Sequence, residues 1–406
     1  MKRKPLAVLL SCLFVATIGF GITLPVLPFY AERFALANQG GGGGSWLGSV
    51  SVQVGLLTAV YPLLQLLAAP IWGRMSDSVG RRRMLLVGIG GATASYILFA
   101  FAASLPMLYV ARAVGGLLSS AIFPAAAAYV ADLTTESERG RGMAWLGAAS
   151  SLGAVVGPAI GGTLARTGWE VRTATGAMII SNFSIPFLTA AALALAAMVG
   201  VLGWVPESHR PLRGPNHTGE PAAGSRGAIR TLLGLSFAAQ FGLALFETTF
   251  ALLAKQMWSY GPSQVGAAFM VCGLVMSVAQ LGVAAAFAQR VGAWPQIAVG
   301  FGLVGASLAL LLVSQRTVIV LLMVATLALG LALVSPNVAT LITLRGGSRT
   351  GAALGAQGTA NGLGQTSGAV LGGMLLAWKM HAPFLIAATV FVVVGIGVGW
   401  WHSAEG

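Results

Sequence analysis

The sequence predicts an all-α membrane protein with twelve transmembrane helices in two pseudo-symmetric six-helix bundles. Three observations predict it: a shortage of charge, twelve long apolar runs and an internal repeat. Only 8% of the 406 residues are charged and 56% are apolar, whereas roughly a quarter of a soluble domain is charged. So few charges cannot cover a water-exposed surface. The composition therefore excludes a cytoplasmic enzyme, a nucleic-acid-binding protein and a secreted disulfide-rich domain.

Twelve apolar runs are long enough to cross a bilayer. A helix that crosses about 30 Å of hydrocarbon needs roughly 20 residues, and the frequent glycines and prolines are tolerated in such helices. The runs cover residues 6–29, 50–73, 84–104, 106–131, 142–165, 178–204, 231–254, 263–288, 295–314, 317–343, 351–377 and 383–401. An even number of spans places both termini on the same side of the membrane.

The distribution of Lys and Arg sets the orientation, because cytoplasmic loops carry the excess of these residues. With the N-terminus inside, sixteen of the 23 basic residues fall in inside segments and six in outside segments, and Arg112 lies within a span. We therefore expect both termini in the cytoplasm. The N-terminus imitates a signal peptide, but its apolar stretch is too long and contains Pro25 and Pro28, so we expect an uncleaved first span.

The two halves of the chain repeat each other. The loop at residues 77–81 recurs 212 residues later at 289–293, and the glycines of the fifth span recur in the eleventh span with an offset of 211. Parallel halves of this kind are typical of transporters that rock about a central site. We predict six-helix bundles at residues 1–204 and 231–406, joined by a cytoplasmic linker at 205–230.

The loop after the second span carries a specific motif. Its residues are Gly73, Asp77, Gly80, Arg81 and Arg82, and their spacing resembles the cytoplasmic signature of the major facilitator superfamily. In that family the motif is a latch that holds one conformation through a charge pair. Here the first glycine would let two helices approach closely, the second would allow a tight turn, and the aspartate would pair with a basic residue. Ordinary positive charge of an inside loop is the alternative.

Two further motifs extend the resemblance to one branch of that superfamily. Gly19, Pro25 and Pro28 resemble the first-span motif of twelve-span drug:proton antiporters. Arg112, with a leucine four residues before it and a glycine four residues after it, resembles a fourth-span motif whose arginine is linked to proton coupling. The resemblance thus implies a proton-coupling role for Arg112.

The fifth span resembles a motif that is associated with antiporters in the superfamily. Its residues are Gly153, Gly157, Pro158, Gly161 and Gly162. Glycines at positions i, i+4 and i+8 form a smooth helix face, and the proline bends the helix. A plain seam for helix packing is therefore the alternative interpretation.

One carboxylate lies well inside an apolar run. Of the ten acidic residues only Glu247 does so, roughly 24 Å along the seventh span. Arg112 lies near the outer end of the fourth span, so the two side chains could share a depth. Burying an ionised carboxylate is costly, and its protonation should depend on access and on partners. A structural glutamate bonded to Arg112 or to a polar neighbour is the alternative.

The segment around this glutamate, residues 246–252, resembles the seventh span of Gram-positive-type multidrug efflux pumps. Many of those pumps have a second acid in the tenth span, where residues 330–337 contain none, and several have one in the first span, where residues 19–21 contain none. Both departures put multi-proton exchange and dicationic substrates in doubt.

Aromatic and amide side chains inside the spans are candidates for substrate binding, because drug sites combine apolar walls with few polar groups. The candidates are Phe20, Gln240, Phe241, Phe246, Phe250, Asn337, Gln357, Asn361 and Gln365. A single phenylalanine is more often in the core or facing lipid. For the amides, binding substrate and joining helices remain equally open.

Together these features predict proton-coupled efflux of amphipathic, cationic or zwitterionic drugs by alternating access in the bacterial cytoplasmic membrane. We expect a monomer that meets its substrate, protons and membrane lipid, with no metal, no nucleic acid and no cofactor beyond the proton gradient. An enzyme is not expected, since no nucleophile–base pair, metal cluster or phosphate loop is evident. An exporter of an endogenous solute, such as a sugar or glycolipid, and a non-transporting membrane sensor stay open as alternatives.

Overall fold

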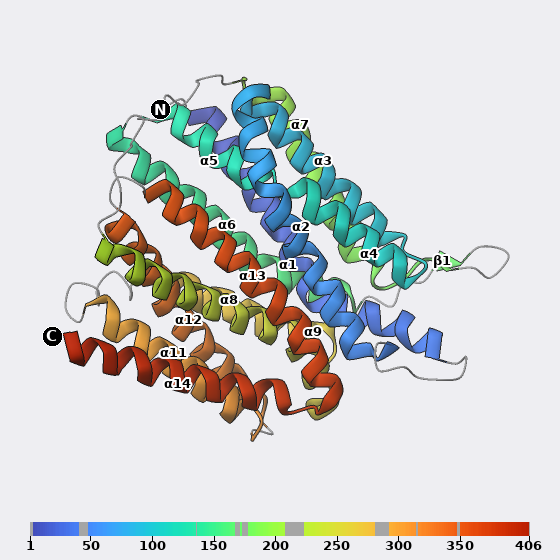
Figure 1. The fold of residues 1–406 in the computed structure, drawn as a ribbon. Helices are drawn as coiled ribbons and strands as arrows, with labels where there is room; N and C mark the ends of the chain where they lie inside the picture. Colours follow the sequence, from blue (N-terminus) through green and yellow to red (C-terminus); the bar gives the residue numbers. More distant parts are fainter. Residues whose placement is uncertain are drawn as a thin grey trace. The chain divides into compact units, whose positions relative to one another are not determined.

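The computed structural model describes residues 3–39, 48–134, 136–166, 171–172, 178–207, 223–280, 292–313, 316–346 and 350–405, and these are almost entirely helical (Figure 1). In chain order the elements are α1 (Arg3–Gln39), α2 (Val50–Val79), α3 (Arg81–Ala100), α4 (Leu105–Val114), the π-helix η2 (Gly115–Ser119), α5 (Ile122–Leu133), α6 (Glu136–Leu164), β1 (Val171–Arg172), β2 (Met178–Ile180), α7 (Ser184–Trp204), α8 (Ala223–Trp258), α9 (Pro262–Val278), α11 (Ala293–Leu311), α12 (Thr317–Gly346), α13 (Thr350–Trp378) and α14 (Ala382–Glu405). The two strands pair in antiparallel orientation.

Helices lie in all twelve predicted spans, but the sixth begins at Ser184 and not at residue 178, because Met178–Ile180 form β2. Within the described residues, ten helical stretches are long and apolar enough to cross a membrane, and α9 is a shorter apolar helix. The eleventh predicted span is α13, a helix of 29 residues. The fourth is one stretch, Leu105–Leu133, that α4, η2 and α5 build together. Residues 281–291, which include the end of the eighth predicted span, lie outside the described residues. The predicted fold class is confirmed.

The chain forms two compact units. Unit 1 comprises Met1–Arg213 and Ser259–Met270, and unit 2 comprises Gly214–Trp258 and Val271–Gly406. The bundle and linker boundaries predicted from the sequence stay a prediction, since residues 208–222 are outside the described part of the chain.

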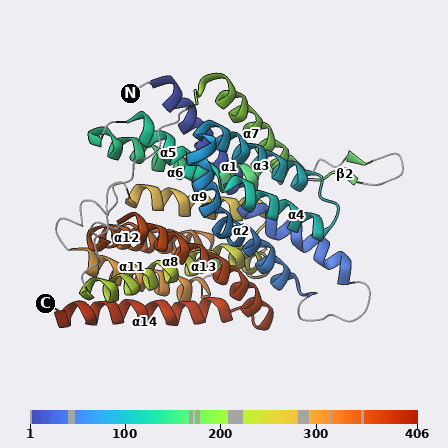
Figure 2. The ribbon, with the colours of Figure 1, turned by 45° about the horizontal axis from the view of Figure 1, so that its top comes forward.

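Each unit is built on long helix pairs. In unit 1, α1 packs along α6 and α7, and α7 also packs along α3 (Figure 1). In unit 2, α8 packs along α13, while α11 contacts both α12 and α14 (Figure 2). Stacked aromatic rings fill the unit cores: the centroids of Phe99 and Phe187 are 4.7 Å apart in unit 1, and those of Phe301 and Phe391 are 5.9 Å apart in unit 2.

Local residue choice sets several helix ends. The Ser49 hydroxyl accepts a hydrogen bond from the Val52 N–H at 3.4 Å and thereby caps α2. The same helix ends at Val79, and the next residue, Gly80, has a φ of 108°, which is open to glycine and rare for other residues. Gly292, with a φ of 76°, precedes α11 in the same way.

Candidate functional site

Arg112 is a buried cation in the fourth span. It lies in the last turn of α4, and 4% of its surface is exposed. Its guanidinium carbon stands 5.4 Å from the centroid of the Tyr61 ring, which α2 supplies. The ring face offers the negative potential that attracts a cation. The polar environment of this arginine within unit 1 therefore includes an aromatic face.

The glycines of the π-helix that follows Arg112 let α2 and α3 come close. A Cβ added to Gly116 would lie 2.6 Å from the Tyr61 carbonyl oxygen, and one added to Gly115 would lie 2.8 Å from the Ser95 hydroxyl. Only glycine fits at such contacts. A π-helix inserts one extra residue into a helix and is frequent at functional sites.

Glu247 lies inside the seventh span, eleven residues before the end of α8 at Trp258. Its side chain is half-buried, whereas its neighbours Phe246 and Phe250 are fully buried with ring centroids 4.9 Å apart. The burial of these two phenylalanines favours a core role over substrate contact. Glu247 belongs to unit 2 and Arg112 to unit 1, so their predicted shared depth stays a prediction.

The amide stripe of the eleventh span bonds to α8. Gln357 donates to the Ser236 hydroxyl at 3.1 Å, and Gln365 donates to the Gln240 side-chain oxygen at 3.0 Å. Asn361 lies between them on the same helix and is half-buried. Of the two roles left open for these amides, the geometry favours joining helices.

The remaining candidates differ in exposure. Asn337 is buried and donates to the Gln296 side-chain oxygen at 3.0 Å and to the Leu333 carbonyl at 2.7 Å. Phe20 and Phe241 are half-buried. Substrate contact by these two rings stays a prediction, while Asn337 is engaged inside unit 2.

The glycine face of the fifth span packs on the first span. A Cβ added to Gly157 or Gly161 would lie 2.5 Å from the carbonyl oxygens of Ile18 and Ile22 respectively, and one on Gly153 would meet Thr17 and the backbone of Phe14. Pro158 lies within α6. Gly162 faces the other way: its added Cβ would meet the Pro262 carbonyl at 2.6 Å and Gly266 at 3.1 Å. The motif is thus a close-packing seam with two sides.

The first-span motif is buried in the same region. Pro25 and Pro28 lie inside α1 and are buried. A Cβ on Gly19 would overlap the Tyr96 ring of α3. This glycine therefore permits α1 and α3 to approach each other closely.

The loop motif differs from the expectation in one respect. We expected Gly73 to permit close helix approach, but beyond its own turn of helix no atom of the described residues lies within 4 Å of a Cβ added there. Gly80 does form a tight turn with positive φ. The predicted Asp77 pairing concerns a side chain outside those that the structure describes.

Within the described part of this region, Arg81 forms an ion pair with Asp132 at the end of α5. The two side chains are 3.5 Å apart and 2% and 4% exposed, and Arg81 also donates to the Ser76 hydroxyl at 3.2 Å. Next to it, the Arg82 N–H donates to a Glu207 carboxylate oxygen at 3.0 Å. Sequence reasoning missed Asp132. The signal available was that a basic cluster needs an acid and that Asp132 ends the neighbouring span.

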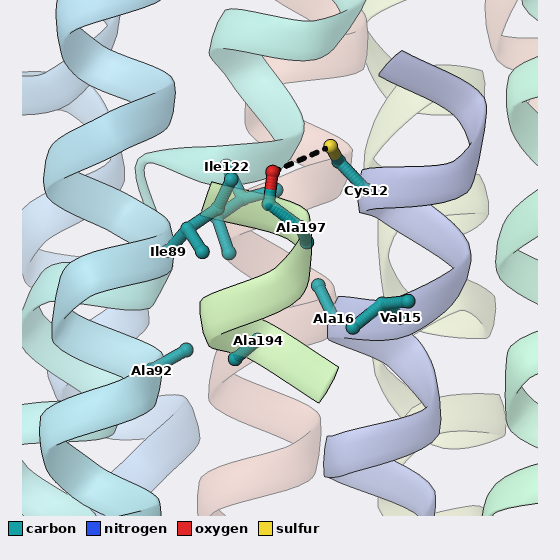
Figure 3. Close-up of a pocket in the computed structure, with 8 residues that line it drawn as sticks. All are labelled: Cys12, Val15, Ala16, Ile89, Ala92, Ile122, Ala194 and Ala197. Carbon is teal, nitrogen blue, oxygen red and sulfur yellow. Dashed lines mark hydrogen bonds between the residues drawn. The ribbon is translucent and has the colours of Figure 1, made fainter. Parts of the chain in front are cut away.

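A small crevice in unit 1 is lined by apolar side chains and one cysteine. Figure 3 shows it among α1, α3, α5 and α7, where Cys12 donates its S–H to the Ala197 carbonyl at 3.4 Å. Its lining residues are Cys12, Val15, Ala16, Ile89, Ala92, Ile122, Ala194 and Ala197. None of the predicted site residues lines it.

Comparisons with known proteins agree on the family. The model of the Major Facilitator Superfamily matches residues 9–364. The chain is 30% identical to Multidrug resistance protein 1 of Bacillus subtilis (strain 168), over 100% of this chain and 98% of that protein. It is 30% identical to the class B Tetracycline resistance protein of Escherichia coli, over 70% of this chain and 66% of that protein. A crystal structure of the peptide transporter POT has a TM-score of 0.78 at 17% identity, over 99% of this chain and 95% of that chain. The chain belongs to the Major Facilitator Superfamily of membrane transporters.

Proposed function

We propose that this protein is not an enzyme but a proton-driven exporter of amphipathic, cationic or zwitterionic drugs. It would work by alternating access in the bacterial cytoplasmic membrane. Both termini would face the cytoplasm. The relatives named for multidrug and tetracycline resistance support the drug-efflux part of the proposal. The observation that carries the proton-coupled part is Glu247, a half-buried carboxylate well inside a membrane span.

The chemistry of a carboxylate in a membrane supports this role. An ionised carboxylate is expensive in hydrocarbon, so intramembrane acids are rare and mark proton or substrate pathways. Deprotonated Glu247 would attract a cation from the cytoplasmic side. Protonation from outside would neutralise the carboxylate and release that cation.

Arg112 supplies the complementary charge in the proposal. It is buried within its span and stays protonated, because a guanidinium does not lose its proton in proteins. In the proposed cycle Arg112 stabilises the deprotonated Glu247 carboxylate when that residue becomes accessible from the cytoplasm again. The half-buried Phe20 and Phe241 would offer ring faces to a planar cationic drug.

A single proton-exchanging carboxylate makes a prediction about energy sources. Exchange of one proton for one monovalent cation moves no net charge, so only the pH gradient drives it, at about 1.4 kcal/mol per pH unit. Exchange for a neutral drug would also use the membrane potential, about 2.3 kcal/mol per 100 mV. Export of a monovalent cation should therefore continue when the potential is collapsed and stop when the pH gradient is collapsed.

Proton flux in reconstituted vesicles tests the proposal. Tetraphenylphosphonium, a monovalent lipophilic cation, is added, and a pH-sensitive dye inside the vesicles reports protons. Wild type should show cation-dependent proton flux, and Glu247→Gln should lose it. The matched control is Glu32→Gln, the same substitution near the end of α1, which should retain the flux.

Three results would contradict the proposal. Full flux in Glu247→Gln would remove this residue from the mechanism. Export that follows the potential alone would reject one-for-one exchange. Absence of flux in the wild type across a panel of cations, with export of a sugar or glycolipid instead, would favour an exporter of an endogenous solute.

A further inference from the structure

We propose that Tyr61 is a positioning residue for Arg112: its ring face holds the guanidinium, and a hydrogen bond to the π-helix fixes the ring. The inference rests on the proposed function, since it assumes that Arg112 acts in proton coupling. It assigns a role to a residue that carries no ionised group and belongs to none of the sequence motifs.

The contact between the two side chains is direct. The Arg112 guanidinium carbon lies 5.4 Å from the Tyr61 ring centroid, within the range of a cation–π interaction. With 4% of its surface exposed, Arg112 has little water to stabilise it. The ring face of Tyr61 is then one of the contacts that set the direction of the guanidinium.

The ring itself is held by a chain of hydrogen bonds. The Ser119 hydroxyl donates to the Gly115 carbonyl at 2.5 Å, so its oxygen is left to accept from the Tyr61 hydroxyl at 2.9 Å. The Tyr61 ring also contacts the ring of Phe20, with centroids 5.6 Å apart. Tyr61 is therefore fixed between the first span and the π-helix.

The π-helix is tied to α2 at a second point. The Trp72 indole N–H donates to the Leu117 carbonyl at 2.6 Å. The segment that begins three residues after Arg112 is thus bonded to α2 by both Tyr61 and Trp72. Any rearrangement of this segment would move the arginine and its aromatic support together.

The test compares the pH dependence of tetraphenylphosphonium export in vesicles for four single variants. Arg112→Gln should shift the pH midpoint. Tyr61→Leu, which removes the ring, should shift it in the same direction by about half a unit to one unit. Tyr61→Phe, which keeps the ring and loses the hydroxyl, should shift it by less. Tyr109→Leu is the matched control, because Tyr109 also joins α4 to α2, through Gln53, and should leave the midpoint unchanged.

A double variant separates positioning from general packing. If Tyr61 acts through Arg112, Tyr61→Leu should add no shift in the Arg112→Gln background. An added shift there, or equal behaviour of Tyr61→Leu and Tyr109→Leu, would overturn this inference and leave the proposed function standing. An unchanged midpoint in Arg112→Gln would overturn the proposed role of that arginine, and this inference with it.

If Tyr61→Leu does not fold, the single variants Tyr61→Phe and Ser119→Ala, and the double variant that combines them, provide the second measurement. Both single substitutions remove the hydroxyl bond and keep the ring. Each should give the same small shift, and the pair together should shift no further than either alone. Additive shifts would show that the bond does not hold the ring in place.

Discussion

The glycine before α3 in unit 1 and the glycine before α11 in unit 2 both have positive φ and extended ψ, but the helices that follow them differ in chemistry. Gly80 has φ 108° and ψ 150°, and Gly292 has φ 76° and ψ 167°. Beside the first turn, unit 1 buries the ion pair of Arg81 and Asp132. The first turn of α11 in unit 2 instead carries Gln296, which forms a neutral amide hydrogen bond with α12.

The comparison shows that the described part of the repeat keeps a glycine of positive φ before the helix, while the polar pair beside it changes from charged to neutral. A buried ion pair contributes little net stability, yet removing one partner strands a charge in a poorly solvated place. Removing one partner of a neutral amide pair leaves only an uncharged polar group without its hydrogen bond. The two turns should therefore respond unequally to equivalent substitutions, and unit 1 should be the more sensitive.

The largest effect is expected for Asp132→Asn. The substitution keeps the shape and removes the charge opposite Arg81, whose side chain is 2% exposed. Thermal unfolding of the purified protein in detergent should show a loss of about 3–5 kcal/mol. The double variant Arg81→Met, Asp132→Leu should recover most of that loss. A single variant as stable as wild type would show that the pair is not effectively buried.

Glycine replacement at the turns comes next. Gly80→Ala and Gly292→Ala force a side chain into positive φ, where strain costs about 1–3 kcal/mol. Gly73→Ala is the control: this glycine is helical and a Cβ there meets open space, so it should be neutral or stabilising by about 0.5–1 kcal/mol. Equal unfolding temperatures for all three variants would contradict a strain-based account of the turns.

How far the sequence could predict the structure is clearest at the glycine seams. The offset of 211 predicted that the fifth and eleventh spans have equivalent small faces. The structure adds the partner positions, Phe14 and Ile18 on α1 and Phe237 and Phe241 on α8, which recur with a different offset. Small residues reveal that a face is close-packed, but the partner register depends on how two helices cross, which spacing does not encode.

The candidate site was less predictable for a similar reason. Charge placement alone pointed to Arg112 and Glu247, because an ionised group in a span is rare. Tyr61 could not be selected this way, since it is uncharged and its contact with Arg112 depends on how the helices are rotated. The π-helix Gly115–Ser119 rotates everything after it by one residue, and adjacent glycines were its only visible sign.

A smaller effect is expected from the amide pair in unit 2. Asn337→Leu removes the hydrogen bond to Gln296 and leaves that amide oxygen without this donor. The expected loss is about 1–2 kcal/mol by thermal unfolding, clearly below that of Asp132→Asn. The variant Gln296→Leu, Asn337→Leu, which removes both partners, should lose less than the single change. A loss as large as that of Asp132→Asn would end the distinction between charged and neutral turns.

The smallest effect concerns a cation of unit 2 that lies beside Trp294 in the first turn of α11. Arg345, in the last turn of α12, lies with its guanidinium carbon 5.3 Å from the Trp294 ring centroid. Because this arginine is half-buried and water still reaches it, Arg345→Gln should cost only about 0.5–1 kcal/mol. Arg345→Lys keeps the cation and should cost less. A loss of several kcal/mol in unfolding measurements would mean that unit 2 relies on a desolvated charge as unit 1 does. The two turns would then differ in the partner of the buried cation, which is an aromatic ring in unit 2 and a carboxylate in unit 1, and not in how deeply the cation is buried.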